Sequence, residues 1–184
     1  MATPDDIDRS GARIVAPIGP NLLDAPLQYI LADHARQRSA CAALQRFAAQ
    51  RFATAAEAEE MSAYFADDLA LHRRDEEESL FPALRRRARK EDGLDDTLTQ
   101  LQAEHGEASA MERAIVNALR QPAEDGAVAL KPATRSLMRR YVRREHRHIA
   151  VENGVVLVIA GIRLNAAELK IMSAAMKARR RAQD

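Results

Sequence analysis

Apolar residues recur every three or four positions along four long stretches of the chain, which is the spacing of amphipathic helices. We expect helices of this kind over about 24–50, 54–89, 94–121 and 132–162. A fifth, shorter helix is expected after Asn165. No segment shows the alternation of apolar and polar residues that is typical of a β-strand, and residues 121–132 are interpreted as a connection.

Residues with strong positional preferences mark several of these helix ends. Asp24 is expected to cap the first helix, with Pro26 in its first turn. Asn165 and Glu168 resemble a capping box at the start of the last helix. Pro82 is expected to kink or shorten the second helix, because proline has no backbone N–H group.

Four long amphipathic helices joined by short links pack most economically as an antiparallel up-down four-helix bundle. The sequence therefore predicts an all-α protein whose bundle spans residues 22–162. An irregular leader is expected over 1–21, and a C-terminal helix with a basic tail over 163–184.

The composition narrows the class of protein. A chain of 184 residues is long enough for one domain with a full hydrophobic core. The net charge is +1 with both signs spread along the chain, which predicts no general attraction to nucleic acid or to membranes. Basic runs at 85–90, 138–148 and 177–181 are interpreted as solvated helix faces, with docking of an acidic partner as the minor alternative.

Three features favour a cytoplasmic location. Cys41 is the single cysteine, so an intramolecular disulfide is excluded and a reducing compartment is expected. Residues 1–20 lack the apolar region of a secretory signal. The most apolar run, Gly154–Ile162, is shorter than the roughly 20 residues that cross a bilayer, so we expect it in the core.

Four of the five histidines fall on the apolar stripes of the four long helices: His34, His72, His105 and His148. Counted from the turns between antiparallel helices, these four positions lie at similar heights along the bundle. They are therefore expected to meet in one layer of the interior. His146 lies off the stripe and is expected to face solvent.

Two of these histidines have a carboxylate four residues later, His72 with Glu76 and His148 with Glu152. Residues at i and i+4 lie on one helix face, one turn apart. In the second helix Asp75 is an alternative to Glu76, but Glu152 is the only nearby downstream acid in the fourth helix. By analogy, Glu76 is the expected inward carboxylate.

Six inward-facing titratable groups would be costly to bury without a partner. A single histidine on an apolar stripe is usually a hydrogen-bonded core residue, so a buried polar network is the alternative to a metal site. The conjunction of four histidines and two carboxylates at one level favours metal.

Nitrogen and carboxylate ligands without thiolate suit two iron ions better than a structural zinc ion. Dimanganese or a mixed iron–manganese pair are alternatives. Two histidines per iron, two bridging carboxylates and one oxo or hydroxo bridge would leave one open position on each ion.

Four further residues near this layer have less specific roles. Asp33 and Glu104 each directly precede a histidine and are interpreted as partners of the ligands or as solvent-exposed, because they lie about 100° off the stripe. Cys41 and Tyr141 lie about 10 Å along the helix axis from the nearest histidine. We expect both to pack in the core.

These motifs resemble those of the hemerythrin-like (HHE cation-binding) family over about residues 25–162, in the segments Asp33-His34, His72-x3-Glu76 followed by Leu80-Phe81-Pro82, Glu104-His105, and His148-x3-Glu152-Asn153. The resemblance implies a di-iron site with six ligands, His34, His72, Glu76, His105, His148 and Glu152.

The chain departs from parts of this family. Oxygen-carrying hemerythrins have a further histidine one turn after the third-helix histidine, where this chain has Ser109, which argues against reversible O2 storage. The second half has Val158-Ile159 in place of the proline segment. Relatives that repair iron centres carry an added cysteine-bearing N-terminal domain, whereas the leader here has no cysteine.

Two functions are therefore considered. The first is a non-haem di-iron protein that binds or reacts with O2, NO or peroxide, in sensing, scavenging or iron handling. The second is an iron-responsive interaction module without turnover, in which metal orders the bundle and a surface such as the C-terminal helix contacts a partner. Oligomeric state and protein partners do not follow from these residues.

Overall fold

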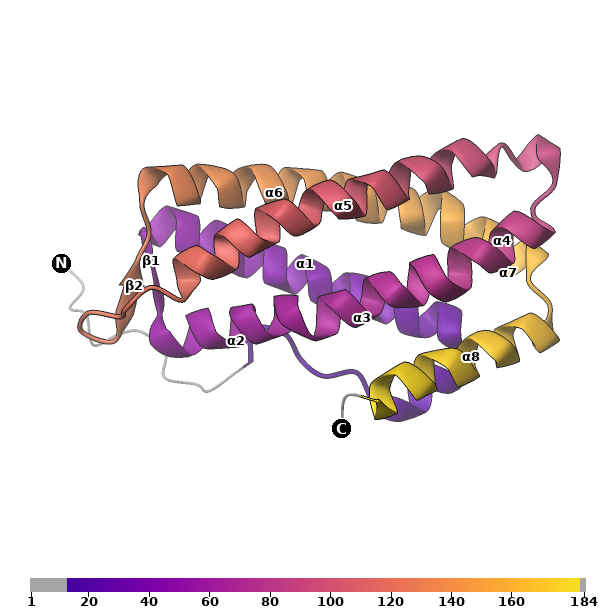
Figure 1. The fold of residues 1–184 in the computed structure, drawn as a ribbon, viewed down its shortest axis with the longest axis horizontal. Helices are drawn as coiled ribbons and strands as arrows, with labels where there is room; N and C mark the ends of the chain where they lie inside the picture. The colour runs from indigo at the N-terminus through magenta and orange to yellow at the C-terminus, as the bar shows by residue number, and fades with distance from the viewer. Residues whose placement is uncertain (1–12, 183–184) are drawn as a thin grey trace.

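The computed structural model describes residues 13–182, and this part of the chain is mostly helical. Four helical rods run side by side along the molecule (Figure 1). The first rod is α1 (Pro26–Gln50), and the third is α5 (Leu94–Leu119). The second rod consists of α2 (Ala55–Ala66), α3 (Asp68–Asp75), the π-helical turn η3 (Glu76–Leu80) and α4 (Phe81–Arg87). The fourth rod consists of α6 (Pro132–Val151), the π-helical turn η5 (Glu152–Val156) and α7 (Leu157–Arg163). The expected all-α class is confirmed.

The start of α1 differs from the expectation. Ala25 rather than Asp24 is the N-cap residue, and no side chain caps the helix. Asp24 ends a short 3-10 helix, η2 (Pro20–Asp24), and its carboxylate pairs with Lys177. The prediction that Asp24 caps α1 was wrong because the 3-10 turn moves the helix start forward by one residue. Of the expected leader, residues 1–12 lie outside the described part of the chain.

The second rod is not one continuous helix. Thr54 begins it with a capping box, in which its hydroxyl accepts from the Glu57 N–H and the Glu57 carboxylate accepts from the Thr54 N–H. The rod is interrupted at Asp67 and again by η3. Pro82 lies in the first turn of α4, directly after the π-helical turn. That turn takes up the irregularity that a proline, which has no N–H to donate, would otherwise force on the helix.

Two short strands were not expected. β1 (Phe52–Thr54) pairs antiparallel with β2 (Ala127–Ala129), with Ala53 opposite Val128. They tie the α1–α2 connection to the α5–α6 connection at one end of the molecule (Figure 1). The expectation that the chain has no strand was wrong because three residues are too few for an alternating pattern to be visible.

The apolar core is divided into two clusters, one on each side of the histidine level. The cluster toward the strands includes Leu44, Phe47 and Ile115. The cluster toward the other end includes Ile30, Phe81 and Leu84. The polar residues of the site therefore lie between two dry layers, which exclude water from it.

The apolar run Gly154–Ile162 only partly joins the core. Val156 and Ala160 are fully buried, but Val158 and Ile162 are 52% and 69% exposed. The expectation that the whole run is core was wrong, because an outer helix buries only one stripe. Among residues 13–182, none of the helices combines the length and the hydropathy that a bilayer-spanning segment needs.

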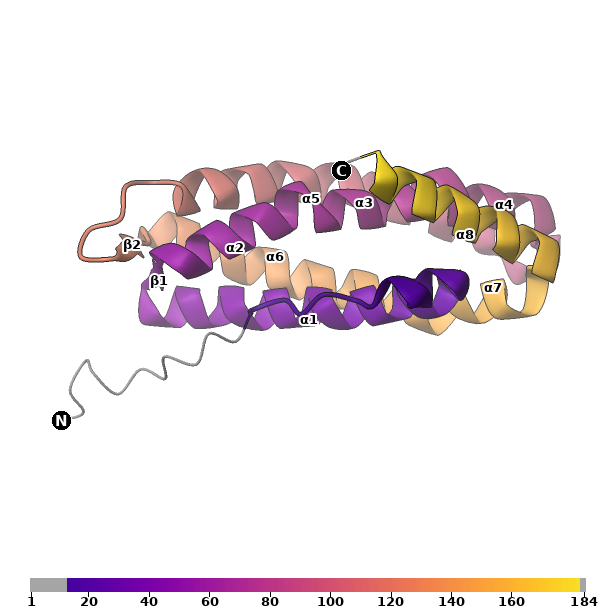
Figure 2. The same cartoon turned by 90° about the horizontal axis from the view of Figure 1, so that it is seen from below.

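The C-terminal helix α8 (Ala166–Arg181) begins with the expected capping box of Asn165 and Glu168. It lies across the molecule beside α1 and α3 (Figure 2). Met172 and Met176 of α8 are buried against the neighbouring helices. The helix therefore covers one side of the rods, close to the π-helical turn η3.

Candidate metal centre

The six residues expected to bind metal lie together in the interior. Their side chains come from all four rods, and none of the six residues is more than 6% exposed. One group that could hold an ion contains His34, His72, Glu76 and Glu152, and a second contains His105, His148 and Glu152. His146, by contrast, is exposed, as expected.

The two carboxylates lie between the two pairs of histidines. Glu76 Oε1 is 3.5 Å from His34 Nε2, and Glu76 Oε2 is 3.4 Å from both His72 Nε2 and His105 Nε2. Glu152 Oε2 is 3.3 Å from His34 Nε2, and Glu152 Oε1 is 3.0 Å from His148 Nε2. Each carboxylate therefore reaches imidazoles from both halves of the chain.

Both carboxylates begin a π-helical turn. The Glu76 carbonyl accepts from the Phe81 N–H, and the Glu152 carbonyl accepts from the Leu157 N–H, each five residues later. π-helical turns inside α-helices are frequent at functional sites. Because η5 has no proline, the feature that the two turns share is the inward carboxylate at their first residue.

Two outer carboxylates orient histidines of the neighbouring rods. Asp33 Oδ2 lies 3.1 Å from His72 Nδ1, and Glu104 Oε2 lies 2.9 Å from His148 Nδ1. Both acids are buried, with 2% and 8% exposure. Asp33 and Glu104 are therefore partners of the histidines rather than solvent-exposed residues. Each carboxylate accepts a hydrogen bond from an Nδ1–H group and directs the other ring nitrogen inward.

The other two histidines are held in the same way by residues that sequence reasoning missed. His34 Nδ1 lies 2.6 Å from Asn153 Oδ1, and His105 Nδ1 lies 2.7 Å from Glu77 Oε1. Asn153 and Glu77 directly follow the inward glutamates of the two halves. That repeated position is visible in the sequence, but the contacts with His34 and His105 depend on where the neighbouring rods lie.

Several inward-facing atoms have no hydrogen-bond partner within residues 13–182, whereas the Nε2 atoms of His105 and His148 form a hydrogen bond with each other at 2.9 Å. His34 Nε2 and both carboxylate oxygens of Glu76 and Glu152 are buried without a hydrogen-bond partner among the described residues. Orphaned polar atoms of this kind cost free energy unless a ligand satisfies them. The nitrogen and oxygen donors, which include no thiolate, suit a pair of transition-metal ions such as iron or manganese. The residues present therefore fit such a group.

The electrostatics of the site pair imidazolium with carboxylate. Burial opposes protonation of His72, but the charge of Glu76 and the hydrogen bond to Asp33 outweigh it and raise the pKa of His72 to about 10. Burial is likewise outweighed at His148, where Glu152 and Glu104 raise the pKa to about 9. Burial would raise the pKa of Glu76, but the charge of His72 and the interactions with His34 and His105 together outweigh it and hold the pKa below its usual range. These raised pKa values favour protonated His72 and His148 in the metal-free protein, and metal binding would compete with those protons.

The position one turn after His105 is closed by an ion pair. Ser109 Oγ donates to the His105 carbonyl at 2.9 Å and accepts from Arg73 Nη1 at 2.8 Å. The same guanidinium binds the Glu112 carboxylate through both nitrogens, with 2.7 Å between Arg73 Nη1 and Glu112 Oε2. Ser109 therefore stands where a further histidine would lie, and its hydroxyl is engaged by Arg73 and the His105 carbonyl.

Cys41 and Tyr141 pack in the core, as expected. Both belong to the apolar cluster on the strand side of the site. The ring of Tyr141 meets that of Phe65 edge-on at 5.7 Å, and burial raises the pKa of the Cys41 thiol. Neither residue belongs to the two groups that could hold an ion.

Comparison with known families agrees with this geometry. The family model described as the hemerythrin HHE cation-binding domain matches residues 25–160, which include all six inward residues. No curated protein sequence matches the chain. Because the match covers most of the chain and the histidine–carboxylate layer lies within it, this protein belongs to the hemerythrin HHE cation-binding family.

Proposed function

We propose that this protein is a non-haem di-iron protein that binds or reacts with a small ligand, namely O2, NO or peroxide. The observation that carries the proposal is the pair of carboxylates between two histidine pairs, with all four carboxylate oxygens lacking a hydrogen-bond partner among the described residues. The four rods would form the antiparallel up-down bundle typical of hemerythrin-like proteins.

The six inward residues divide into two sets of ligands. His34 and His72 would bind one ion, and His105 and His148 the other. Glu76 and Glu152 would bridge the two ions, because each lies within 3.5 Å of imidazole nitrogens from both pairs. Iron is favoured over manganese by the four imidazole nitrogens, since manganese prefers oxygen-rich sites.

When bound, the iron pair would supply electrons and an open coordination position for a diatomic ligand or peroxide. The protein's own residues set the conditions for that chemistry. Asp33, Glu77, Glu104 and Asn153 hold the imidazole rings in place through Nδ1. The apolar clusters on both sides keep bulk water away from the site.

Reaction or sensing is favoured over reversible O2 storage. The position that carries an extra histidine in oxygen-carrying hemerythrins is Ser109, whose hydroxyl is held by Arg73 and by the His105 carbonyl. A set of two histidines on each side leaves the two ions more alike than a three-and-two arrangement would.

The test is metal analysis of protein purified without an affinity tag, followed by anaerobic absorption spectra before and after addition of O2, NO and peroxide. We expect close to two irons per chain and a spectrum that changes with at least one of these ligands. Less than about one metal per chain would contradict the di-iron proposal and favour the buried polar network. Manganese in place of iron would contradict only the choice of metal.

The same spectra separate turnover from the interaction-module alternative. If iron removal unfolds the protein while none of the three ligands changes the spectrum of the iron-loaded form, the site has a structural role. Such a result would overturn the proposed reactivity but not the metal site.

A further inference from the structure

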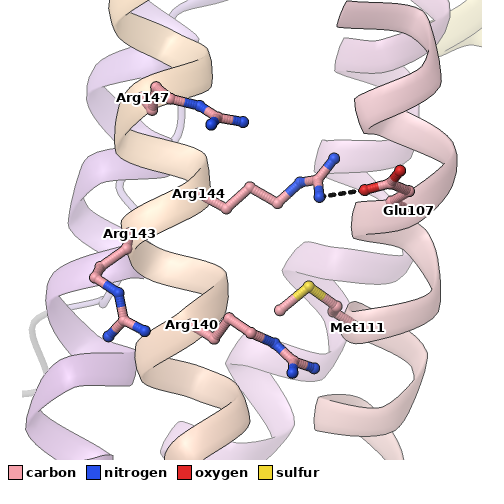
Figure 3. Close-up of a pocket in the computed structure, with 6 residues that line it drawn as sticks. All are labelled: Glu107, Met111, Arg140, Arg143, Arg144 and Arg147. Carbon is pink, nitrogen blue, oxygen red and sulfur yellow. Dashed lines mark hydrogen bonds and ion pairs between the residues drawn. The ribbon is translucent and has the colours of Figure 1, made fainter. Parts of the chain in front are cut away.

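A second concave site lies on the outer surface between α5 and α6 (Figure 3). It has a volume of about 510 Å³ and is lined by Glu107, Met111, Arg140, Arg143, Arg144 and Arg147. We call it the arginine groove. None of its residues is among the six proposed metal ligands, although Arg147 contacts Glu104, which in turn holds His148.

The four arginines of the groove share one side of α6. Their spacing is i, i+3, i+4 and i+7, and neighbours at such spacings lie one turn apart. Like charges at these distances repel one another, so the cluster destabilises the free protein unless anions compensate it. A bound anion would lessen that repulsion, which solvent already weakens because Arg140, Arg143 and Arg147 are exposed.

The chain supplies only part of the negative charge that would compensate the cluster. Arg144 pairs with Glu107 and also donates to the Glu104 carbonyl, while Arg147 donates to the Glu104 carboxylate at 2.9 Å. Arg140 and Arg143 make no ion pair with any residue in the described part of the chain. On α5, the position facing Arg140 is Met111, one turn after Glu107 (Figure 3). Two guanidinium groups are thus left without a carboxylate: that of Arg140 points toward α5, and that of Arg143 lies at the edge of the groove on the other side of α6 (Figure 3).

The uncompensated charge matches a phosphate group. A phosphate monoester carries about −1.5 to −2 charges at pH 7, and guanidinium binds its oxygens through two parallel N–H groups. The volume is in the range of small-molecule sites, about 300–1,000 Å³. Met111 is the only apolar residue in the lining, and no aromatic residue is present there to select a ring.

We propose that the arginine groove binds a small anion carrying one or more phosphate groups, held mainly by Arg140 and Arg143. Recognition is by charge and by the guanidinium geometry rather than by a nucleobase or sugar. The near-zero net charge of the chain disfavours nucleic acid as the occupant, because a nucleic-acid-binding domain is usually strongly basic overall.

The experiment is calorimetric titration of the metal-loaded full-length protein with inorganic pyrophosphate at physiological salt. We expect saturable binding at one site, and at least a tenfold weaker affinity in the Arg140→Ala/Arg143→Ala variant. Arg113→Ala/Arg139→Ala is the matched control: it removes the same charge from exposed positions on α5 and α6 outside the groove, and should bind as the unmodified protein does. Circular dichroism and metal content, measured before and after titration, confirm that all forms stay folded and loaded.

Three outcomes would overturn the proposal. One is the absence of saturable binding at millimolar pyrophosphate. Another is equal loss in both double variants, which would mean diffuse attraction to a basic surface. The third is full binding by Arg140→Ala/Arg143→Ala, which would place the anion outside the groove.

Two further titrations identify the source of the anion. Inorganic phosphate should bind more weakly than pyrophosphate and should depend on the same two arginines. A short DNA duplex or a glutamate-rich peptide that binds in the groove more tightly than pyrophosphate would replace the small phosphate ligand by a macromolecular partner and overturn the proposal.

Discussion

The two halves of the chain contribute residues to the candidate metal centre in the same pattern, but they differ in how far other parts of the protein shield them from solvent. In each half an acid precedes the first histidine, the second histidine is followed four residues later by a glutamate, and a π-helical turn begins at that glutamate. The relay Arg36–Asp33–His72 in the first half corresponds to Arg147–Glu104–His148 in the second.

The difference lies in the outermost residue of each relay. The Arg36 side chain is only 11% exposed, and it donates to the Ala16 carbonyl, to Asp33 and to Asp68. The Arg147 side chain is 64% exposed and lines the arginine groove. Residues 13–21 and α8 enclose the first half, whereas the second half faces solvent through its arginines. The two halves of the site thus resemble each other in the six proposed ligands. They differ in how deeply the residues that hold those ligands, which we call the supports, are buried.

The largest expected effect tests the part that the halves share. His72→Ala and His148→Ala should each reduce metal content from about two ions per chain to one or fewer, because each removes one of two imidazoles on an ion. His146→Ala, on the exposed side of α6, is the control and should keep both metals. Metal analysis and thermal unfolding provide the measurement. Equal loss from His146→Ala and His148→Ala would contradict the assignment of inward residues.

A large pH dependence of metal binding follows from the raised histidine pKa values. His72 and His148, with pKa values of about 10 and 9, hold protons at pH 7 that metal must displace. Release of two protons would strengthen metal binding about a hundredfold for each unit of pH rise near neutrality. Calorimetry in buffers of different ionisation enthalpy counts the protons. A heat that does not depend on the buffer would rule out the release.

The stability of the metal-free protein should change with pH in the opposite direction to metal affinity. Each folded-state pKa lies above the unfolded value of 6.5, so the imidazolium–carboxylate pairs stabilise the metal-free protein fully below about pH 6.5. That contribution is lost as the pH rises through about 9 and 10. Urea unfolding of metal-free protein between about pH 6 and 10 should therefore show decreasing stability, while the metal-loaded protein should not follow that trend.

The supports should respond unequally. Asp33→Ala removes the acceptor of His72 and one of the two carboxylates that hold the buried Arg36, so we expect roughly 10–100-fold weaker metal binding and about 3 kcal/mol of lost stability. Glu104→Ala should weaken metal binding by about tenfold and lower stability by about 1 kcal/mol, because Arg147 returns to solvent.

Matched controls exist for both supports. Asp68→Ala removes a carboxylate from Arg36, and Glu107→Ala removes one from Arg144, but neither acid contacts a histidine. Metal affinity, measured by competition with a chelator, should be almost unchanged in both controls. If Asp33→Ala and Glu104→Ala lower metal affinity and stability equally, the deeper burial of the first half does not strengthen the metal centre.

Much of this arrangement could be predicted from the sequence. The rods follow from apolar spacing, and the six inward residues follow from histidines at matching heights with carboxylates at i+4. Glu77 and Asn153 could not be derived from these periodicities, because a residue directly after an inward position points about 100° away on a regular helix. Their contacts depend on where the neighbouring rod lies, which is tertiary information.

The π-helical turn η5, the two strands and the N-cap of α1 could not be predicted from the local sequence. Pro82 indicated an irregularity in the second rod, but η5 forms the same π-helical turn at Glu152 without any proline. The strands are too short to leave a pattern, and Asp24 has the right chemistry for a cap but lies one residue too early. Sequence chemistry therefore identified the residues that lie together in the interior more reliably than the contacts that hold them in place.

The smallest of the expected effects concerns a support that only the first half has. Asp75 is 1% exposed at its side chain, and its two oxygens accept from Arg179 and Arg180 of α8 at 2.8 and 2.7 Å. Arg179 also donates to Ser79 inside η3 at 2.7 Å, so α8 holds the turn that begins at Glu76. In the second half, no such helix covers the corresponding turn within the described residues.

Arg179→Ala/Arg180→Ala should lower the free energy of unfolding by about 2–3 kcal/mol, because it leaves the Asp75 charge buried without a partner. Adding Asp75→Asn removes that charge and should recover about half of the loss. Lys177→Ala, also on α8, breaks the pair with the 73% exposed Asp24 and should change stability by less than about 0.5 kcal/mol. Urea unfolding of the metal-loaded variants measures all three. If Asp75→Asn recovers nothing, α8 stabilises the first half through its buried methionines rather than through this ion-pair cluster.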